Sequence, residues 1–138
     1  MSVFAIADLH LSLGSEKPMD VFKGWENYVE KIERYWRALI SPSDTVVIAG
    51  DISWGMSLQE SLTDFRFLHE LPGQKLLLKG NHDYWFTTKK KMDAFFEENG
   101  LDTLHILHNN CYQVEGAFLC GTRAVSYTHL PKGKRLCL

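Results

Sequence analysis

The sequence predicts an α/β fold with a parallel sheet, and two observations support this prediction. Short β-branched or leucine-rich runs alternate along the chain with segments of helical periodicity. Three of these runs, at residues 3–7, 46–49 and 76–78, are each followed by a short polar cluster. Buried parallel strands have this composition, and open α/β sheets bind their ligands at the carboxyl ends of such strands. Three clusters that are distant in sequence are therefore expected to meet at one edge of a sheet.

Length and composition favour one soluble domain with its own core. The chain has 138 residues, of which 45% are hydrophobic. Its 15 basic and 17 acidic residues give a formal charge of −2, which supplies no broad positive field for general nucleic-acid binding. No secretory signal and no run long enough for a membrane span is expected. The oligomeric state is left open.

The cysteines favour a reducing, cytoplasmic location. Cys111, Cys120 and Cys137 form no C-x-x-C pair, and an odd number in a chain of this size is not typical of a disulfide framework. We therefore expect no disulfide framework in this chain.

The first half of the chain predicts two strands and two helices. Residues 3–7 form the first strand, and residues 45–49 the second. Between them a helix of about five turns is expected, ended by Ser41-Pro42, because apolar residues recur at Val21, Phe22, Trp25, Tyr28, Val29, Ile32, Trp36, Leu39 and Ile40. Ser57 and Glu60 form a capping-box pattern before a second helix that Pro72-Gly73 terminates.

The second half predicts a third strand at residues 75–79 and a third helix from Thr88 to Asn99-Gly100. Short strands follow near residues 103–107, 112–114 and 117–120, and the last two are joined by a tight turn at Glu115-Gly116.

The first two clusters have the chemistry of a metal site. In Asp8-Leu9-His10, the alternation of an extended segment would point the carboxylate and the imidazole the same way. Asp51 follows Gly50, where the missing side chain permits a tight backbone turn, and its carboxylate can bridge two cations.

The third cluster adds a neutral ligand and a candidate acid. After Gly80, the amide oxygen of Asn81 is a hard metal ligand. An imidazole hydrogen-bonded to a carboxylate is held in one tautomer, so His82 beside Asp83 can protonate a leaving oxygen. Two aspartates, a histidine and an asparagine suit Mn²⁺, Fe or Zn²⁺ rather than a thiolate site.

Each cluster also has a structural interpretation. A single D-x-H or G-D is more often a turn at a strand end, and Asn81-His82-Asp83 can cap the helix that follows. The occurrence of all three clusters, each behind its own strand, favours the metal site over these alternatives.

These residues resemble the calcineurin-like metallophosphoesterase family, whose pattern runs D-x-H, G-D, G-N-H-D/E, a lone His and then G-H-x-H. The match extends from Ser2 to about Arg123 in layout and predicts residues 1–124 to be the N-terminal part of such a domain. The resemblance implies a four-layer αββα sandwich, with its second sheet incomplete in this chain, and two divalent metal ions (Mn, Fe or Zn) at the strand ends.

The resemblance also implies a role for each residue. Asp8 and His10 would bind the first metal, Asp51 would bridge both, and Asn81 would bind the second. His82 with Asp83 would act on the leaving group, as the catalytic pair.

The expected function is hydrolysis of a phosphomonoester or phosphodiester by metal-activated water. The alternative is a non-catalytic scaffold module that binds metal or phosphate. The substrate stays open, because Lys89-Lys90-Lys91 is more typical of a solvated helix face than of a nuclease surface. The aromatic residues Trp54, Tyr84 and Trp85 are similarly open, either walling a substrate pocket or packing in the core.

The last two family motifs are absent from the chain. His105 and His108 lie three apart, where strand alternation points them to opposite faces, so neither is expected to be a ligand. Residues 125–130, VSYTHL, equal one reading frame of a common transposon sequencing adaptor. We therefore expect residues 125–138 to be a non-native tail and His129 to be no ligand.

Overall fold

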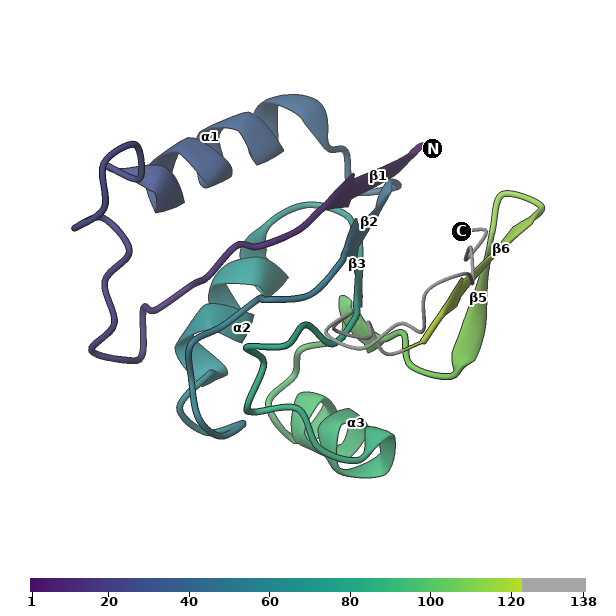
Figure 1. Cartoon of the computed structure of the whole chain (residues 1–138). Helices are drawn as coiled ribbons and strands as arrows, with labels where there is room; N and C mark the ends of the chain where they lie inside the picture. Colours follow the sequence, from purple (N-terminus) through teal and green to yellow (C-terminus); the bar gives the residue numbers. More distant parts are fainter. Residues whose placement is uncertain (123–138) are drawn as a thin grey trace, which may run out of the picture.

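The computed structural model describes residues 1–122, in which helices and strands alternate along the chain (Figure 1). The elements are β1 (Val3–Ile6), α1 (Tyr28–Leu39), β2 (Thr45–Ile48), α2 (Leu62–Glu70), β3 (Gln74–Leu77), α3 (Lys89–Glu98), β4 (Leu104–Ile106), β5 (Asn110–Val114) and β6 (Ala117–Gly121). The expected tail at 125–138, with Cys137 and His129, lies outside the described residues.

Strands β1 to β4 form one parallel sheet in chain order. Strands β5 and β6 pair separately as an antiparallel hairpin, which lies to one side of the sheet in Figure 1. The predicted α/β class with a parallel sheet and a small second sheet is thus confirmed. Because all four strands of the first sheet run the same way, the segments that follow β1, β2 and β3 leave from one edge of it.

The main core lies between the three helices and one face of the sheet. Val46 and Ile48 alternate toward this face, where they join a cluster of buried side chains from α1, α2 and α3. Phe65 is its centre: the ring centroids of Trp85 and Phe96 lie 4.8 and 5.2 Å away, both edge-on. Leu76, from the other face of β3, is buried but stands outside this cluster.

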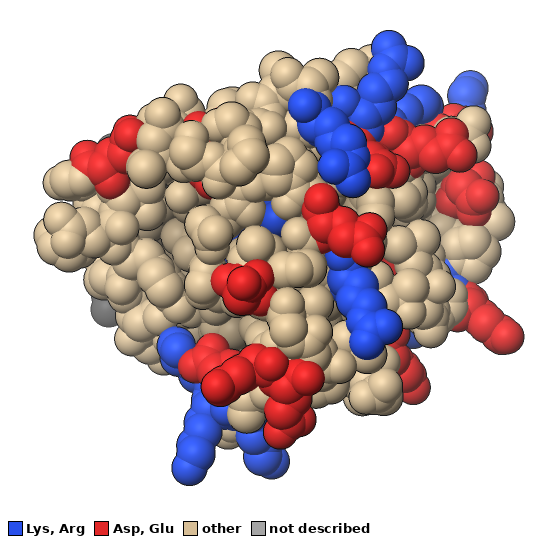
Figure 2. Space-filling model, turned by 180° about the vertical axis from the view of Figure 1, so that it is seen from behind, with Lys and Arg blue, Asp and Glu red and all other residues tan. Residues whose placement is uncertain are grey.

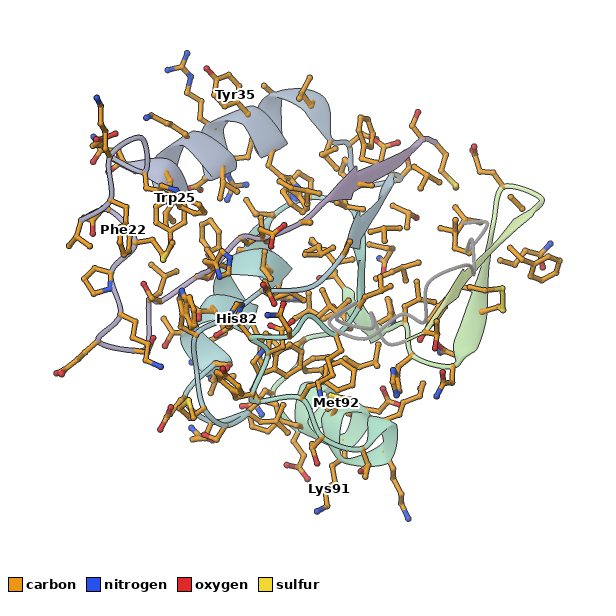
Figure 3. All side chains as sticks on the ribbon, in the orientation of Figure 1. Phe22, Trp25, Tyr35, His82, Lys91 and Met92 are labelled. Atoms are coloured by element: carbon orange, nitrogen blue, oxygen red, sulfur yellow. A yellow bond between two sulfur atoms is a disulfide. The ribbon has the colours of Figure 1, made fainter. Side chains whose placement is uncertain are left out.

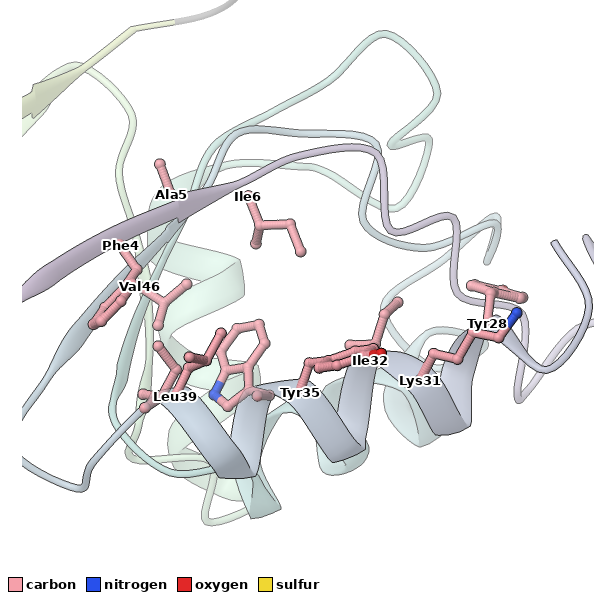
Figure 4. Close-up of a pocket in the computed structure, with 11 residues that line it drawn as sticks. Phe4, Ala5, Ile6, Tyr28, Lys31, Ile32, Tyr35, Leu39 and Val46 are labelled. Atoms are coloured by element: carbon pink, nitrogen blue, oxygen red, sulfur yellow. The ribbon is translucent and has the colours of Figure 1, made fainter. Parts of the chain in front are cut away.

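Strand β1 differs from the buried strand that its composition predicts. It lies at one edge of the sheet, and Val3 and Ala5 are exposed. Its other face and α1 border an apolar groove of about 390 Å³, lined among others by Phe4, Ile32 and Trp36 (Figure 4). Within residues 1–122, no helix has both the length and the apolar character needed to cross a membrane.

The first helix is shorter than its apolar stripe predicts. It begins only at Tyr28, and Val21 and Phe22 are exposed on the segment before it. Gly24 and Asn27 both have positive φ, and the preceding turns are closed by i to i+3 hydrogen bonds, such as Trp25 N–H to the Phe22 carbonyl. Left-handed residues interrupt the α-helical hydrogen-bond pattern, so periodicity alone places the start too early.

The signals at the other helix ends are largely confirmed. Helix α3 begins next to Thr88, as predicted, and the Thr88 side chain caps it by accepting a hydrogen bond from the Lys91 N–H. Ser57 accepts from the Glu60 N–H, but the Glu60 carboxylate returns to the Met56 N–H rather than to Ser57. Only half of the expected capping box forms, and α2 begins at Leu62.

The hairpin confirms one prediction and corrects another. Glu115 and Gly116 form the turn, both with positive φ, as predicted. The expectation of no disulfide framework is wrong for Cys111 and Cys120, which form a disulfide. The register of β5 and β6 places these two residues directly opposite each other, a pairing that a count of cysteines cannot detect.

Charged side chains of both signs are mixed over the face shown in Figure 2, without a broad basic area.

Candidate metal centre

The segments that follow β1 and β2 run side by side and are joined by backbone hydrogen bonds. The Asp8 N–H donates to the Gly50 carbonyl at 3.1 Å, and the His10 N–H to the Asp51 carbonyl at 2.9 Å. Asp8, His10 and Asp51 all have left-handed backbone, with φ of 56°, 44° and 51°. Non-glycine residues of this kind store about 1–3 kcal/mol each and gather at functional sites.

This geometry corrects the reason for which Asp8 and His10 were expected together. The segment is not extended, so strand alternation does not align the two side chains. They converge because the backbone turns at each of them.

The predicted ligands of the first metal are brought together. Asp8, His10 and Asp51 each offer one ligand atom, and these atoms all lie within 4.8 Å of one another. The His10 Nε2 atom is 3.8 Å from Asp8 Oδ1 and 3.9 Å from Asp51 Oδ2. Asp8 is exposed, His10 half-buried and Asp51 buried, so the cluster opens to solvent on the Asp8 side.

Asp51 links this cluster to the segment after β3. Its Oδ1 accepts the His82 backbone N–H at 2.9 Å, and its Oδ2 lies 2.9 Å from the His82 Nδ1. Burial acts to raise the pKa of the Asp51 carboxyl, but these hydrogen bonds and the nearby imidazoles of His82 and His10 outweigh it and lower that pKa. The ionised carboxylate is the form that binds metal.

Two glycines allow the close approach that the sequence predicts. A Cβ on Gly80 would lie 2.1 Å from Asp51 Oδ1 and 2.2 Å from the Asp51 backbone nitrogen. A Cβ on Gly50, whose φ is 96°, would lie 2.6 Å from the Gly80 Cα. Side chains at either position would separate the two segments that carry Asp51 and His82.

Asp83 does not pair with His82, which corrects the expected hydrogen bond between them. Its buried carboxylate instead accepts five N–H groups: the backbone N–H of Asp51, Ile52, Ser53 and Gly80 and the indole N–H of Trp85. Because the side chain is fully committed to these donors, His82 turns to Asp51. Asp83 therefore fastens the segment after β2 to the segment after β3.

Asn81 lies at the same edge but is exposed, with its amide nitrogen 3.5 Å from the His82 Nε2. The other histidines of residues 1–122 lie apart from this cluster. The His105 Nε2 lies 2.7 Å from the Gln74 side-chain oxygen, and the His108 ring packs edge-on against Phe86.

The three aromatic residues near the clusters have different surroundings. Trp85 is buried in the core, as one alternative held, whereas Tyr84 is 54% exposed. Trp54 stacks on the His10 ring, a contact that sequence reasoning missed because it joins a residue after β1 to one after β2.

Asp64 was also missed. It is buried in α2 and accepts hydrogen bonds from the Ser53 hydroxyl and the Leu13 N–H, so it holds the two segments beside the cluster. Burial raises the pKa of its carboxyl. An aspartate inside an apolar helical stripe was the available signal.

Comparison with known proteins relates this chain to a protein family. The sequence profile of the calcineurin-like phosphoesterase family matches residues 1–134. The chain belongs to the calcineurin-like phosphoesterase family. No match was found among curated proteins.

Two solved structures are similar to this calcineurin-like chain. A protein of unknown function from Aquifex aeolicus is 21% identical, with a TM-score of 0.48 over 86% of this chain and 58% of its own. The phosphopantetheinyl hydrolase of Mycobacterium tuberculosis is 18% identical, with a TM-score of 0.50 over 97% of this chain and 46% of its own. The chain thus spans about half the length of these structures.

The donor set of this family member fits a divalent metal. One imidazole and two carboxylates supply nitrogen and hard oxygen ligands, the set preferred by Mn²⁺, Fe and Zn²⁺. The left-handed backbone brings these ligands close together, and the lowered pKa of Asp51 favours its ionised carboxylate.

Proposed function

We propose that the chain carries the metal-binding part of a metal-dependent phosphoesterase that hydrolyses phosphomonoesters or phosphodiesters. The convergence of Asp8, His10 and Asp51 supports this proposal most directly, because three ligand atoms meet at the carboxyl edge of the sheet. Membership of the calcineurin-like family supports the same class of reaction.

In this proposal the site holds two divalent ions, such as Mn²⁺. Asp8 and His10 would hold the first, Asp51 would lie between them, and Asn81 would contribute to the second. When bound, such ions polarise phosphoryl oxygens and lower the pKa of a bound water to near neutrality.

His82 has the position of an acid for the leaving group. Its Nδ1 is engaged by the Asp51 carboxylate, which fixes the ring and favours a proton on that nitrogen. The side chain is 38% exposed, so Nε2 in the protonated ring is available to donate a proton to a leaving oxygen. Asp83 supports this role indirectly, because it positions the loop and does not touch His82.

The experiment is hydrolysis of bis(p-nitrophenyl) phosphate with added Mn²⁺, together with Mn²⁺ binding by calorimetry. Asp51→Asn is expected to abolish both, since it removes the charge that the metals share. Asp93→Asn is the matched control, because Asp93 is an exposed carboxylate on α3 that pairs with Lys89. Unchanged turnover in Asp51→Asn would refute the proposal.

One observation favours the alternative of a non-catalytic metal-binding module. Within residues 1–122, the metal cluster contains a single histidine, because His69, His105 and His108 are engaged elsewhere. Mn²⁺ binding without any turnover of mono- or diesters would support this module over the enzyme.

A further inference from the structure

Trp54 lies against both histidine rings of the candidate metal centre. Its indole stacks on His10, with centroids 5.1 Å apart and planes 23° apart. The same indole meets the ring of His82 at 5.2 Å. Its backbone N–H donates to the Leu11 carbonyl at 2.9 Å, so its position is fixed by the joined segments after β1 and β2.

The His10 ring has no hydrogen-bond partner among residues 1–122. Its Nε2 faces the carboxylates of Asp8 and Asp51, at 3.8 and 3.9 Å. A metal-binding histidine usually donates its other ring N–H to a carboxylate, a carbonyl or a water, which fixes the ring. No carboxylate or carbonyl of the described residues does this for His10, and the aromatic rings of Trp25 and Trp54 border its ring.

The backbone of His10 is fixed independently of its ring. Its N–H donates to the Asp51 carbonyl, and its carbonyl accepts the Tyr28 hydroxyl at 2.8 Å. Rotation of the side chain is the freedom that remains. Trp25, from the segment before α1 (Figure 3), limits it from one side by an edge contact at 5.9 Å, and the Trp54 stack limits it further.

The indole nitrogen of Trp54 makes this side chain a poor choice for packing alone. The Nε1 atom is buried and has no hydrogen-bond partner among residues 1–122. An unsatisfied buried donor is destabilising, and an apolar side chain at this position would avoid that penalty. The contacts of the ring offset this cost, including the Lys17 ammonium 5.4 Å from its centroid.

We propose that Trp54 is a positioning residue for the metal centre: its stacked indole holds the His10 imidazole with Nε2 toward Asp8 and Asp51. The stack takes the place of the usual hydrogen bond to the other ring nitrogen. This inference rests on the proposed function, because it takes His10 as a metal ligand.

The test compares Mn²⁺ affinity, measured by calorimetry on the full chain, in the wild type and two variants. Trp54→Leu keeps an apolar side chain but removes the stack, and we expect affinity to fall about tenfold, as for other supports of a metal ligand. Trp54→Phe keeps a ring, so affinity is expected to stay within about threefold of the wild type.

Tyr84→Leu is the matched control. Tyr84 is an exposed aromatic residue whose ring centroid is 6.4 Å from that of His82, and it makes no stack with His10. Its substitution is expected to leave Mn²⁺ affinity unchanged. Urea unfolding of each variant establishes that it is folded before affinities are compared.

A second readout does not depend on the metal. Proton NMR of the metal-free chain should show the His10 ring resonances displaced by the ring current of Trp54, and Trp54→Phe should reduce that displacement. If Trp54→Leu does not fold, the ring-current displacement of the His10 resonances tests the stack instead. Its absence in the wild type overturns the proposal.

The outcomes separate this inference from the function beneath it. Wild-type affinity in Trp54→Leu, or equal losses in Trp54→Leu and Trp54→Phe, overturns positioning by the stack and leaves the phosphoesterase proposal standing. A wild-type chain that binds no Mn²⁺ overturns the proposed function, and the role of Trp54 with it.

Discussion

The two ends of β3 hold buried charges that the protein treats in opposite ways. Past the carboxyl end, Asp83 is 1% exposed and accepts five N–H groups. At the amino end, Lys75 is fully buried, and among residues 1–122 its ammonium reaches only the carbonyls of Leu71 and His69 and the Thr103 hydroxyl. Burial lowers the pKa of Lys75 to about 8, against 10.5 in water.

The difference lies in how completely each charge is solvated by the fold. Asp83 receives converging bonds from two backbone segments, so its charge holds the metal-site loops together. The contacts of Lys75 to His69 and Thr103 are long, at 3.5 and 3.4 Å, and replace water incompletely. The buried charge of Asp83 therefore stabilises one end of the strand, whereas that of Lys75 destabilises the other.

Removal of the Asp83 carboxylate should have the largest effect. Asp83→Ala leaves five buried N–H donors without an acceptor, and we expect a loss of about 4 kcal/mol or more in the free energy of unfolding. Urea denaturation measures it. Asp83→Asn, which keeps the volume but presents an NH₂ group to those donors, should lose nearly as much. A loss under about 1 kcal/mol in both would contradict the role of Asp83.

Substitution of Gly80 and Gly73, which lie past the two ends of β3, should affect the metal site differently. Gly80→Ala places a Cβ 2.2 Å from the Asp51 backbone nitrogen, and should cost about 3 kcal/mol and weaken Mn²⁺ binding as well. Gly73 has a φ of 89°, and a Cβ added there would lie 2.9 Å from the Asp44 carbonyl oxygen. Gly73→Ala should therefore lower the free energy of unfolding by about 2 kcal/mol and leave Mn²⁺ affinity unchanged. Unfolding measurements and calorimetry on both variants test this prediction. Equal effects of the two substitutions on Mn²⁺ affinity would contradict it.

Lys75 should give the chain an unusual alkaline stability profile. Because the pKa of Lys75 is lower in the folded than in the unfolded chain, the unfolded chain binds more protons between about pH 8 and pH 10.5. The free energy of unfolding should therefore rise across this window, by up to about 3 kcal/mol. Lys75→Met should remove the rise in urea titrations at several pH values. A flat wild-type profile would show that the ammonium is better solvated than its contacts indicate.

Thr103 should have the smallest effect. Thr103→Val removes the hydroxyl that lies 3.4 Å from the Lys75 ammonium and 2.9 Å from the His69 Nδ1. Stability at pH 7 should fall by about 1 kcal/mol, and less at pH 10, where Lys75 is mostly neutral. The same fall at both pH values would mean that Thr103 acts through packing or His69 alone.

Much of the fold was predictable because its signals are local. Apolar runs placed β1 to β4, Thr88 marked the start of α3, and Glu115-Gly116 marked the hairpin turn. Each signal depends on periodicity or on the φ that a residue tolerates, and neighbours in sequence decide both. The start of α1 was predicted too early, because the left-handed turn at Asn27 leaves the apolar stripe unchanged.

By itself, the sequence determined that Asp8, His10, Asp51 and Asn81 would leave from one edge of a parallel sheet, because parallel strands send their carboxyl ends the same way. Only the tertiary structure decided which groups bond there. Asp83 binds the backbone after β2 instead of the adjacent His82, and Trp54 stacks on a residue more than forty positions away. The spacing of residues in the sequence determines the strand end to which a side chain is attached. Its bonding partner depends on which segments the packing brings within about 3 to 5 Å.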